Sequence, residues 1–153
     1  MDIQRISDEL EIASVLNRYA RAVDSKDWDL LRSLFTADAE LDYSSVGGPA
    51  GDREEVCSWL ERSLALMPMT QHFVTNIEAD IDGDTATVRA MFYNPMLLPG
   101  ATETSACGGY YHHVMVRTET GWRSKRLRED NLWFDNPPSA QRRAELQEKA
   151  DRA

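Results

Sequence analysis

Cysteine, histidine and long apolar runs are all scarce in this chain of 153 residues. The two cysteines, Cys57 and Cys107, lie in different segments without the paired spacing of zinc sites, so we expect free thiols rather than a disulfide or a metal site. No apolar run approaches the ~20 residues that cross a bilayer. The first residues are acidic and amphipathic, unlike a signal peptide. We therefore expect a cytoplasmic protein without a membrane segment.

A surplus of basic residues is also missing. Lys and Arg together number 17 against 26 Asp and Glu, which gives a formal net charge of −9. Nucleic acids and anionic membranes both require a basic footprint, so neither is expected as a partner. The hydrophobic fraction of 42% and the charged fraction of 28% are typical of a globular protein. The length fits one domain that buries its core without disulfides or a metal.

The first third of the chain predicts helices. Apolar residues from Leu10 to Val23 recur mostly every three or four positions, as on one face of a helix, and Ser7 is a plausible N-cap. Asp27 is a plausible N-cap for a second helix that starts at Trp28. A third helix is predicted over residues 53–66. Between the second and third helices, residues 40–43 alternate like a short strand.

The rest of the chain predicts strands, over residues 71–81, 85–93, 106–118 and 122–133. Asp82-Gly83-Asp84 is a strong hairpin signal between the first two, and Asn94-Pro95 is expected to end the second. Residues 1–136 are therefore interpreted as one domain. Residues 137–153 are expected to form a charged helix or a frayed end.

Helices followed by a meander of long strands indicate an α+β fold. We expect a mixed or antiparallel sheet that curves into a cone and is roofed by the N-terminal helices. Binding pockets lie in such cavities.

Histidine is the commonest general acid or base near neutral pH, which makes His72 a candidate catalytic residue. A hydrogen-bonded core histidine is the alternative interpretation. The neighbours His112 and His113 must point to opposite faces of a strand, so only one of them can face the pocket. Which one does so is not determined by the sequence, and their divergence disfavours a three-histidine metal site.

Asp24 follows the apolar stripe of the first helix. It either marks the end of that helix or reaches His72, where a carboxylate would fix the imidazole tautomer and raise its basicity. Tyr19 and Tyr43 are either core aromatics or groups that polarise a substrate oxygen, because a buried phenol needs a hydrogen-bond partner.

A set of short stretches occurs in a characteristic order over about residues 5–135. The set comprises YARAVDSKDWDLL (residues 19–31), Leu41-Asp42-Tyr43, Thr70-Gln71-His72-Phe73, Asn76 and Gly121-Trp122. It resembles the scytalone dehydratase and SnoaL-like family of the nuclear-transport-factor-2-like superfamily. The resemblance implies an α+β cone with a deep pocket, a catalytic dyad of His72 and Asp24, and no cofactor. Bile-acid dehydratases of this group use tyrosines that look like Tyr19 and Tyr43.

The same resemblance implies a different set of substrate contacts. Val23 stands where scytalone dehydratase has a tyrosine, and Tyr110 and His112 fall opposite its polar Ser and Asn. Asn131 aligns with an arginine of the bile-acid enzymes, for which Arg126 or Arg128 is a possible substitute. The expected substrate-binding residues are His112, Tyr110, Asn131, Arg128 and Trp28.

The leading hypothesis is a cofactor-independent lyase, a dehydratase, that acts on a cyclic or polyketide-like small molecule. His72 would be the general base, Asp24 would hold it, and His112 would assist protonation of the leaving group. A SnoaL-like cyclase, an isomerase and a non-catalytic ligand-binding protein are the alternatives. A distance between Asp24 and His72 beyond hydrogen-bond reach would favour the binding protein. A homo-oligomer, a dimer or trimer, is expected from the resemblance.

Overall fold

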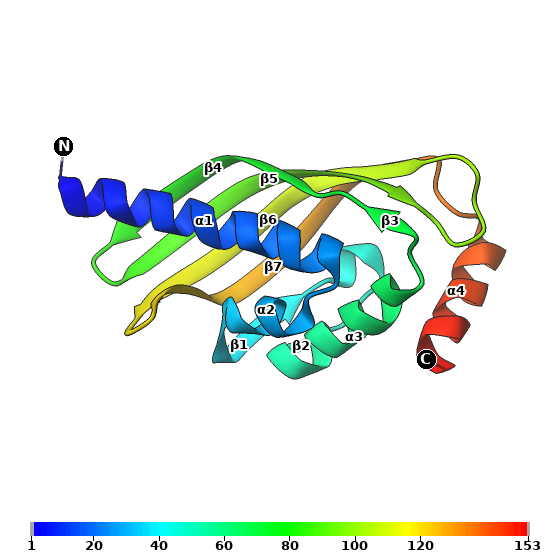
Figure 1. Cartoon of the computed structure of the whole chain (residues 1–153), viewed down its shortest axis with the longest axis horizontal. Helices are drawn as coiled ribbons and strands as arrows, with labels where there is room; N and C mark the ends of the chain where they lie inside the picture. Colours follow the sequence, from blue (N-terminus) through cyan, green and yellow to red (C-terminus); the bar gives the residue numbers. More distant parts are fainter. Residues whose placement is uncertain (1, 153) are drawn as a thin grey trace.

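A seven-stranded mixed sheet curls around one side of a long helix in the computed structural model of the chain (Figure 1), which describes residues 2–152. The helices are α1 (Ile3–Ser25), α2 (Trp28–Ser33), α3 (Arg53–Ala65) and α4 (Ala140–Arg152), with a short 3-10 turn η1 (Ser44–Val46). The strands are β1 (Phe35–Asp42), β2 (Ala50–Asp52), β3 (Met69–Thr70), β4 (Phe73–Asp82), β5 (Thr85–Leu97), β6 (Ser105–Thr118) and β7 (Gly121–Asp135). This arrangement confirms the predicted α+β cone.

The order of the strands makes the sheet mixed rather than purely antiparallel. Strands β4 to β7 form the predicted antiparallel meander. Strand β1, which is longer than predicted, adds to the free edge of β7 in parallel, with Leu41 opposite Leu127. The helical first third of the chain is thereby joined to its last strand.

Helix α1 lies across the concave face of the sheet and supplies much of the core (Figure 1). Its apolar stripe is buried at Ile12, Leu16, Tyr19 and Val23, as the periodicity predicts. The helix begins before the predicted cap, because the carboxylate of Asp2 accepts the N–H of Gln4 and caps it there.

Asp8 fixes the first half of α1 to the hairpin of β6 and β7. Its buried carboxylate accepts two hydrogen bonds from the Arg117 guanidinium, at 2.7 and 2.8 Å, and one from Trp122 Nε1 at 3.1 Å. These bonds, led by the one from Arg117, hold the pKa of Asp8 well below its usual range despite burial. The ion pair thus sets the position of α1 over the sheet.

Strand β5 continues through Pro95, although the sequence predicts its end there. Phe73 of β4 pairs with Tyr93, and Thr70 of β3 pairs with Met96, so Pro95 lies opposite the gap between β3 and β4. A proline is tolerated in a strand where no partner needs its missing N–H. Pro95 still contributes its carbonyl oxygen, which accepts the N–H of Gln71 at 3.1 Å.

Helix α4 covers the right-hand end of the cone in Figure 1, where it packs beside α3. Of the two alternatives expected for the end of the chain, a charged helix or a frayed end, the structure shows the helix. Among residues 2–152, no helix has the length and apolar character needed to cross a membrane.

Candidate active site

A cavity of about 170 Å³ lies between the concave face of the sheet and helices α1 and α3. We call it the inner cavity. Its walls are mainly apolar and aromatic, and they include Tyr19, Tyr43, Trp59, Phe92, Tyr111 and Phe134. The polar groups on these walls are few, and three of the four predicted catalytic residues, His72, Tyr19 and Tyr43, are among them.

Asp24 and His72 are held together by two separate hydrogen bonds. Oδ1 of Asp24 lies 2.6 Å from Nδ1 of the His72 imidazole, and Oδ2 accepts the backbone N–H of the same residue at 2.7 Å. The hydroxyl of Thr70 donates to Oδ1 at 2.9 Å. The His72 side chain is only 8% exposed, whereas that of Asp24 is 23% exposed.

Local structure explains this geometry on both sides. Asp24 lies in the last turn of α1, which ends at Lys26 in the left-handed conformation. His72 lies in the gap between β3 and β4, where its N–H has no partner in the sheet and is free to reach Asp24. The break in the strand and the end of the helix therefore meet at one carboxylate.

The protonation states follow from these contacts. Burial opposes ionisation of Asp24, but the hydrogen bonds from His72 and Thr70 outweigh it and lower the pKa of the carboxyl below its usual value. An ionised Asp24 can only accept, so Nδ1 of His72 carries the proton that they share. In the neutral imidazole this puts the lone pair on Nε2, which is the tautomer that a general base facing the cavity requires.

Tyr19 and Tyr43 are directly hydrogen-bonded through their hydroxyl groups inside the cavity. Both residues are almost fully buried. Burial raises the pKa of each phenol, so both stay neutral. The pair holds two hydroxyl protons and uses one between its members, which leaves the other available to a ligand oxygen.

Glu129 and Asn94 also line the inner cavity, although the sequence analysis predicts neither as a site residue. Glu129 is 7% exposed, and burial raises its pKa to about 7. Asn94 Oδ1 is buried without a hydrogen-bond partner among the described residues. Glu129 stands two residues after Leu127, which faces the core, so strand alternation from Leu127 onward puts both on the same face.

Three of the five expected substrate-binding residues lie on the outer face of the sheet, away from the inner cavity. Tyr110 stacks under Arg89 at 4.0 Å, and His112 lies 3.8 Å from Asp130. Arg128 pairs with His112 on that face. Trp28 packs at the edge of the core and does not line the cavity.

The open choice between His112 and His113 is also resolved. His113 points inward but is a neutral core residue, whose Nδ1 lies 2.9 Å from Ser124 Oγ and whose pKa burial lowers to about 3. Neither histidine lines the inner cavity. A bulge at Gly108 and Gly109, where a side chain on Gly109 would collide with the Asp130 carbonyl, shifts the alternation of β6 against β7.

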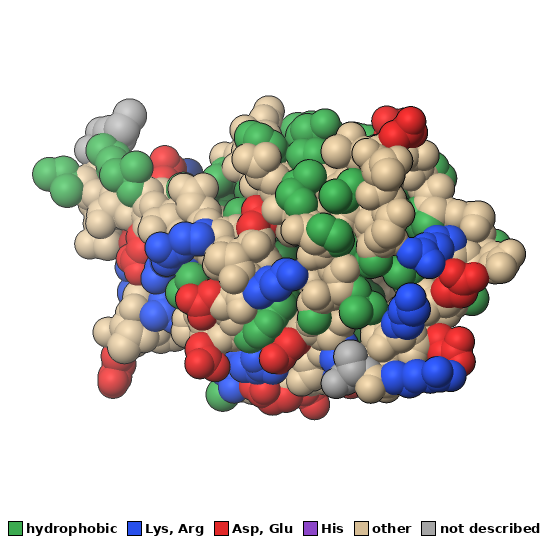
Figure 2. Space-filling view, turned by 45° about the vertical axis from the view of Figure 1, so that its right-hand side comes forward, with side chains coloured by type: hydrophobic (Ala, Val, Ile, Leu, Met, Phe, Trp, Pro, Cys, Tyr) green, Lys and Arg blue, Asp and Glu red, His purple; other side chains and the backbone are tan. Residues whose placement is uncertain are grey.

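A second cavity of about 640 Å³ adjoins the first and is closed by α4. We call it the outer cavity. Trp59, Met67, Met96 and Phe134 line both, so the inner cavity opens toward the outer one. Figure 2, which brings this end of the molecule forward, shows hydrophobic side chains beside a region of mixed acidic and basic ones.

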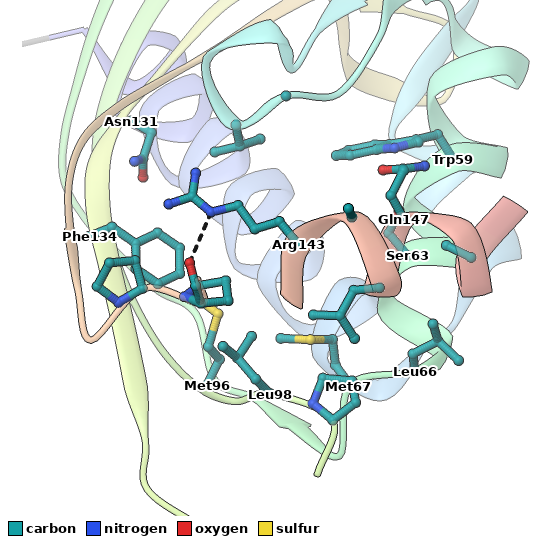
Figure 3. A pocket seen from close by; sticks show the side chains of 18 of the residues that line it. Trp59, Ser63, Leu66, Met67, Met96, Leu98, Asn131, Phe134, Arg143 and Gln147 are labelled. Atoms are coloured by element: carbon teal, nitrogen blue, oxygen red, sulfur yellow. Dashed lines mark hydrogen bonds between the residues drawn. The ribbon is translucent and has the colours of Figure 1, made fainter. Parts of the chain in front are cut away.

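Asn131, the remaining expected substrate contact, does lie at the outer cavity, with its Oδ1 buried and without a partner among the described residues. In Figure 3, Arg143 extends from α4 into this space toward Asn131 and Phe134, and its Nε donates to the Pro138 carbonyl at 3.1 Å. Within residues 2–152, no group of three His, Cys, Asp or Glu side chains is arranged to hold a metal ion.

Comparison with known proteins agrees with this architecture. Residues 4–128 match the model of the SnoaL-like domain. The uncharacterised protein Rv2910c of Mycobacterium tuberculosis is 37% identical over 124 residues, which cover 80% of this chain and 84% of that protein.

Solved structures are similar as well. A proposed aromatic ring hydroxylase from Novosphingobium aromaticivorans is 30% identical with a TM-score of 0.74, over 84% of this chain and 91% of that one. A proposed scytalone dehydratase from the same organism reaches a TM-score of 0.82 at 20% identity, over 91% and 93% of the two chains. The names of these two proteins imply different reactions, so the chemistry has to be argued from the site itself.

Proposed function

The chain belongs to the SnoaL-like domain family of the nuclear-transport-factor-2-like superfamily, and on this premise we propose that it is a cofactor-independent lyase. The proposed reaction is the dehydration of a cyclic or polyketide-like small molecule. His72 acts as the general base and Asp24 as the residue that holds and orients it.

The observation that carries the proposal is the 2.6 Å contact between Asp24 Oδ1 and His72 Nδ1 beside the inner cavity. A protein that only binds a ligand has no need of an oriented imidazole with a free Nε2. The contact lies well within hydrogen-bond reach, which supports an enzyme over a ligand-binding protein.

In the proposed mechanism, Nε2 of His72 removes a proton from a carbon beside a carbonyl group. The ionised Asp24 stabilises the imidazolium that forms. The free hydroxyl proton of the Tyr19–Tyr43 pair donates to the carbonyl oxygen, where negative charge develops. These hydrogen bonds act in a desolvated cavity, which strengthens them.

The composition of the cavity wall supports an uncharged, ring-containing substrate. No Lys or Arg within the described part of the chain lines the inner cavity, so a carboxylate or phosphate of the substrate would find no counter-charge there. Aromatic residues on several sides suit the flat faces of a ring.

The test uses two simple ketones in heavy water. The first is a plain aryl ketone, whose uptake of deuterium next to the carbonyl reports the proton-removal step alone. The second is the β-hydroxy ketone formed by aldol addition of acetone to benzaldehyde, whose dehydration gives a conjugated product with a new ultraviolet absorption. We expect both activities in the wild-type protein.

His72→Ala should lower both activities by at least about 100-fold, since one well-placed base contributes ~10²–10⁴-fold. His113→Gln is the matched control, because that histidine lies in the core away from the cavity. Unchanged exchange and dehydration in a folded His72→Ala variant would contradict the proposal. Exchange without any dehydration would instead favour an isomerase or a cyclase.

A further inference from the structure

Among residues 2–152, Glu129 is the one acidic side chain that lines the inner cavity. It lies on β7, directly opposite Tyr111 of β6, and it is 7% exposed. The structure gives its carboxyl group neither a hydrogen bond nor an ion pair among the described residues. Burial of a carboxyl group without hydrogen-bond partners lowers the stability of the folded protein, so its presence on this wall indicates a function.

The titratable groups that face Glu129 come from several elements. Tyr19 belongs to α1, Tyr43 follows β1, Cys107 and Tyr111 belong to β6, and His72 lies between β3 and β4. The first four have pKa values raised by burial and are neutral near pH 7. No cation therefore holds Glu129 in its charged form, unless His72 has taken up a proton.

Burial accordingly raises the pKa of Glu129 to about 7. Asp24 has the opposite environment, with three hydrogen-bond donors that keep it ionised. Two carboxyl groups, one bound to His72 and the other on the wall of the inner cavity, thus differ in protonation. Such a difference separates the acid from the base in an active site.

We propose that Glu129 is a second catalytic residue, whose protonated carboxyl group donates its proton to the departing hydroxyl of the substrate. This inference rests on the proposed function and sharpens it. Hydroxide is a poor leaving group and departs only when it receives a proton, whereas a halide departs without one. A cavity with a built-in carboxylic acid therefore fits a β-hydroxy carbonyl compound rather than a β-halo compound.

The step balances without a further reactant. Nε2 of His72 accepts the proton from the α-carbon, and the C–H electron pair becomes the second bond of the new alkene. The carbon–oxygen bond breaks with its electron pair on oxygen, which takes the proton of Glu129 and leaves as water. The imidazolium of His72 then returns its proton to the Glu129 carboxylate, directly or through water, which restores both groups.

The protonation of Glu129 can be measured first, on the intact protein without a ligand. A buried protonated carboxyl gives an infrared carbonyl band that an ionised one lacks. We expect this band below pH 7, its loss as the pH rises through about 7, and its absence in Glu129→Gln. Asp130→Asn is the matched control, since Asp130 is the next residue on the opposite, outer face. A Glu129 that is ionised at pH 6 overturns the proposal.

The catalytic role is tested with two leaving groups on one carbon skeleton. The probes are the β-hydroxy ketone described above and its β-(para-nitrophenoxy) analogue, whose leaving group departs without a proton. Glu129→Gln should lower the dehydration rate about 100-fold or more and leave both nitrophenolate release and deuterium exchange unchanged. Glu129→Asp should recover part of the dehydration rate.

Other results separate the two proposals. Equal losses of rate with both leaving groups would mean that Glu129 has a structural role, and no loss with either would mean that it takes no part in the reaction. Either result overturns the proposed role of Glu129. Deuterium exchange that depends on His72 would still support the proposed function. A wild-type protein inert in exchange and in elimination overturns the proposed function and the role of Glu129 together.

Discussion

The Asp24 carboxylate binds the imidazole and the backbone amide of His72 at the same time, at 2.6 and 2.7 Å. Asp24 thus holds both the ring and the adjacent backbone of His72, which leaves the imidazole little freedom to rotate. The orientation of the proposed base is therefore fixed before any substrate enters, which lowers the cost of reaching the reactive geometry.

Replacing this carboxylate should affect turnover more than stability. In Asp24→Asn, the side-chain amide can donate to Nδ1, which would move the histidine proton to Nε2 and abolish the base. We expect a loss of roughly 10²–10⁴-fold in the dehydration rate. Thr70→Val, which removes only one hydrogen bond to Asp24, should retain most of the rate. A fully active Asp24→Asn would show that His72 needs no partner.

The two cavity tyrosines should be energetically coupled. Tyr19→Phe or Tyr43→Phe alone leaves the other hydroxyl buried without its partner, at a cost of about 1–3 kcal/mol. The double variant should cost less than the sum of the two, as a double-mutant cycle from urea unfolding would measure. Strict additivity would mean that the hydroxyl–hydroxyl bond contributes nothing to folding.

Glu129 should make the folded state less stable as the pH rises. Its pKa is about 7 in the fold against 4.5 for the ordinary value, so the folded protein binds more protons than the unfolded one between these two values. Stability that is full below pH 4.5 is then lost as the pH passes 7. The shift corresponds to roughly 3 kcal/mol, so Glu129→Gln should gain about that much at pH 8 and almost nothing at pH 4. Equal gains at both pH values would exclude this linkage.

Asp8 should behave in the opposite way. Its pKa is lowered by Arg117, so its contribution is present above the ordinary value of 3.8 and is lost as the pH falls below that value. Asp8→Ala leaves Arg117 and Trp122 without their acceptor and should destabilise by roughly 3 kcal/mol at pH 7. Asp84→Ala removes only the exposed partner of the same arginine and should cost less than about 1 kcal/mol. Similar losses in the two variants would argue against the special role of Asp8.

The outer face of the sheet should mediate assembly of a dimer or trimer. Phe73, Tyr93 and Trp133 stack in a row there, each between 43% and 49% exposed. Such a row of exposed aromatics is typical of an interface. Light scattering after gel filtration should give a multiple of the chain mass for the wild type and for Glu148→Lys on α4, but one chain mass for Tyr93→Lys. A monomeric wild type would refute the expected assembly.

The fold and the contact between Asp24 and His72 could be predicted because each rests on a local or ordered signal. The periodicity around Leu16, the Asp82-Gly83-Asp84 turn and the Thr70-Gln71-His72-Phe73 stretch each keep their meaning without knowledge of the rest of the chain. The family resemblance supplied their assembly.

The substrate contacts could not be predicted in the same way, because they depend on which residues of the two long strands β6 and β7 face inward. The register shift between Val114 and Met115 moves the inward positions of β7 from Trp122 and Ser124 to Leu127 and Glu129. Asn131 therefore also faces the interior, while Arg128 and His112 face outward. The end of β5 was missed because Pro95 lies opposite a gap that exists only in three dimensions.

The parallel pairing of β1 with β7 also constrains how the chain is made. Synthesis proceeds from the N-terminus, so Asp24 and His72 leave the ribosome well before residues 121–135, which supply the partner of β1 and carry Glu129. Until then β1 has only the short β2 beside it, and contacts between distant segments are slow to form. The inner cavity is consequently among the last features of the nascent protein to take shape, and a chain that stops before β7 would contain the histidine and its aspartate but no enclosed site around them.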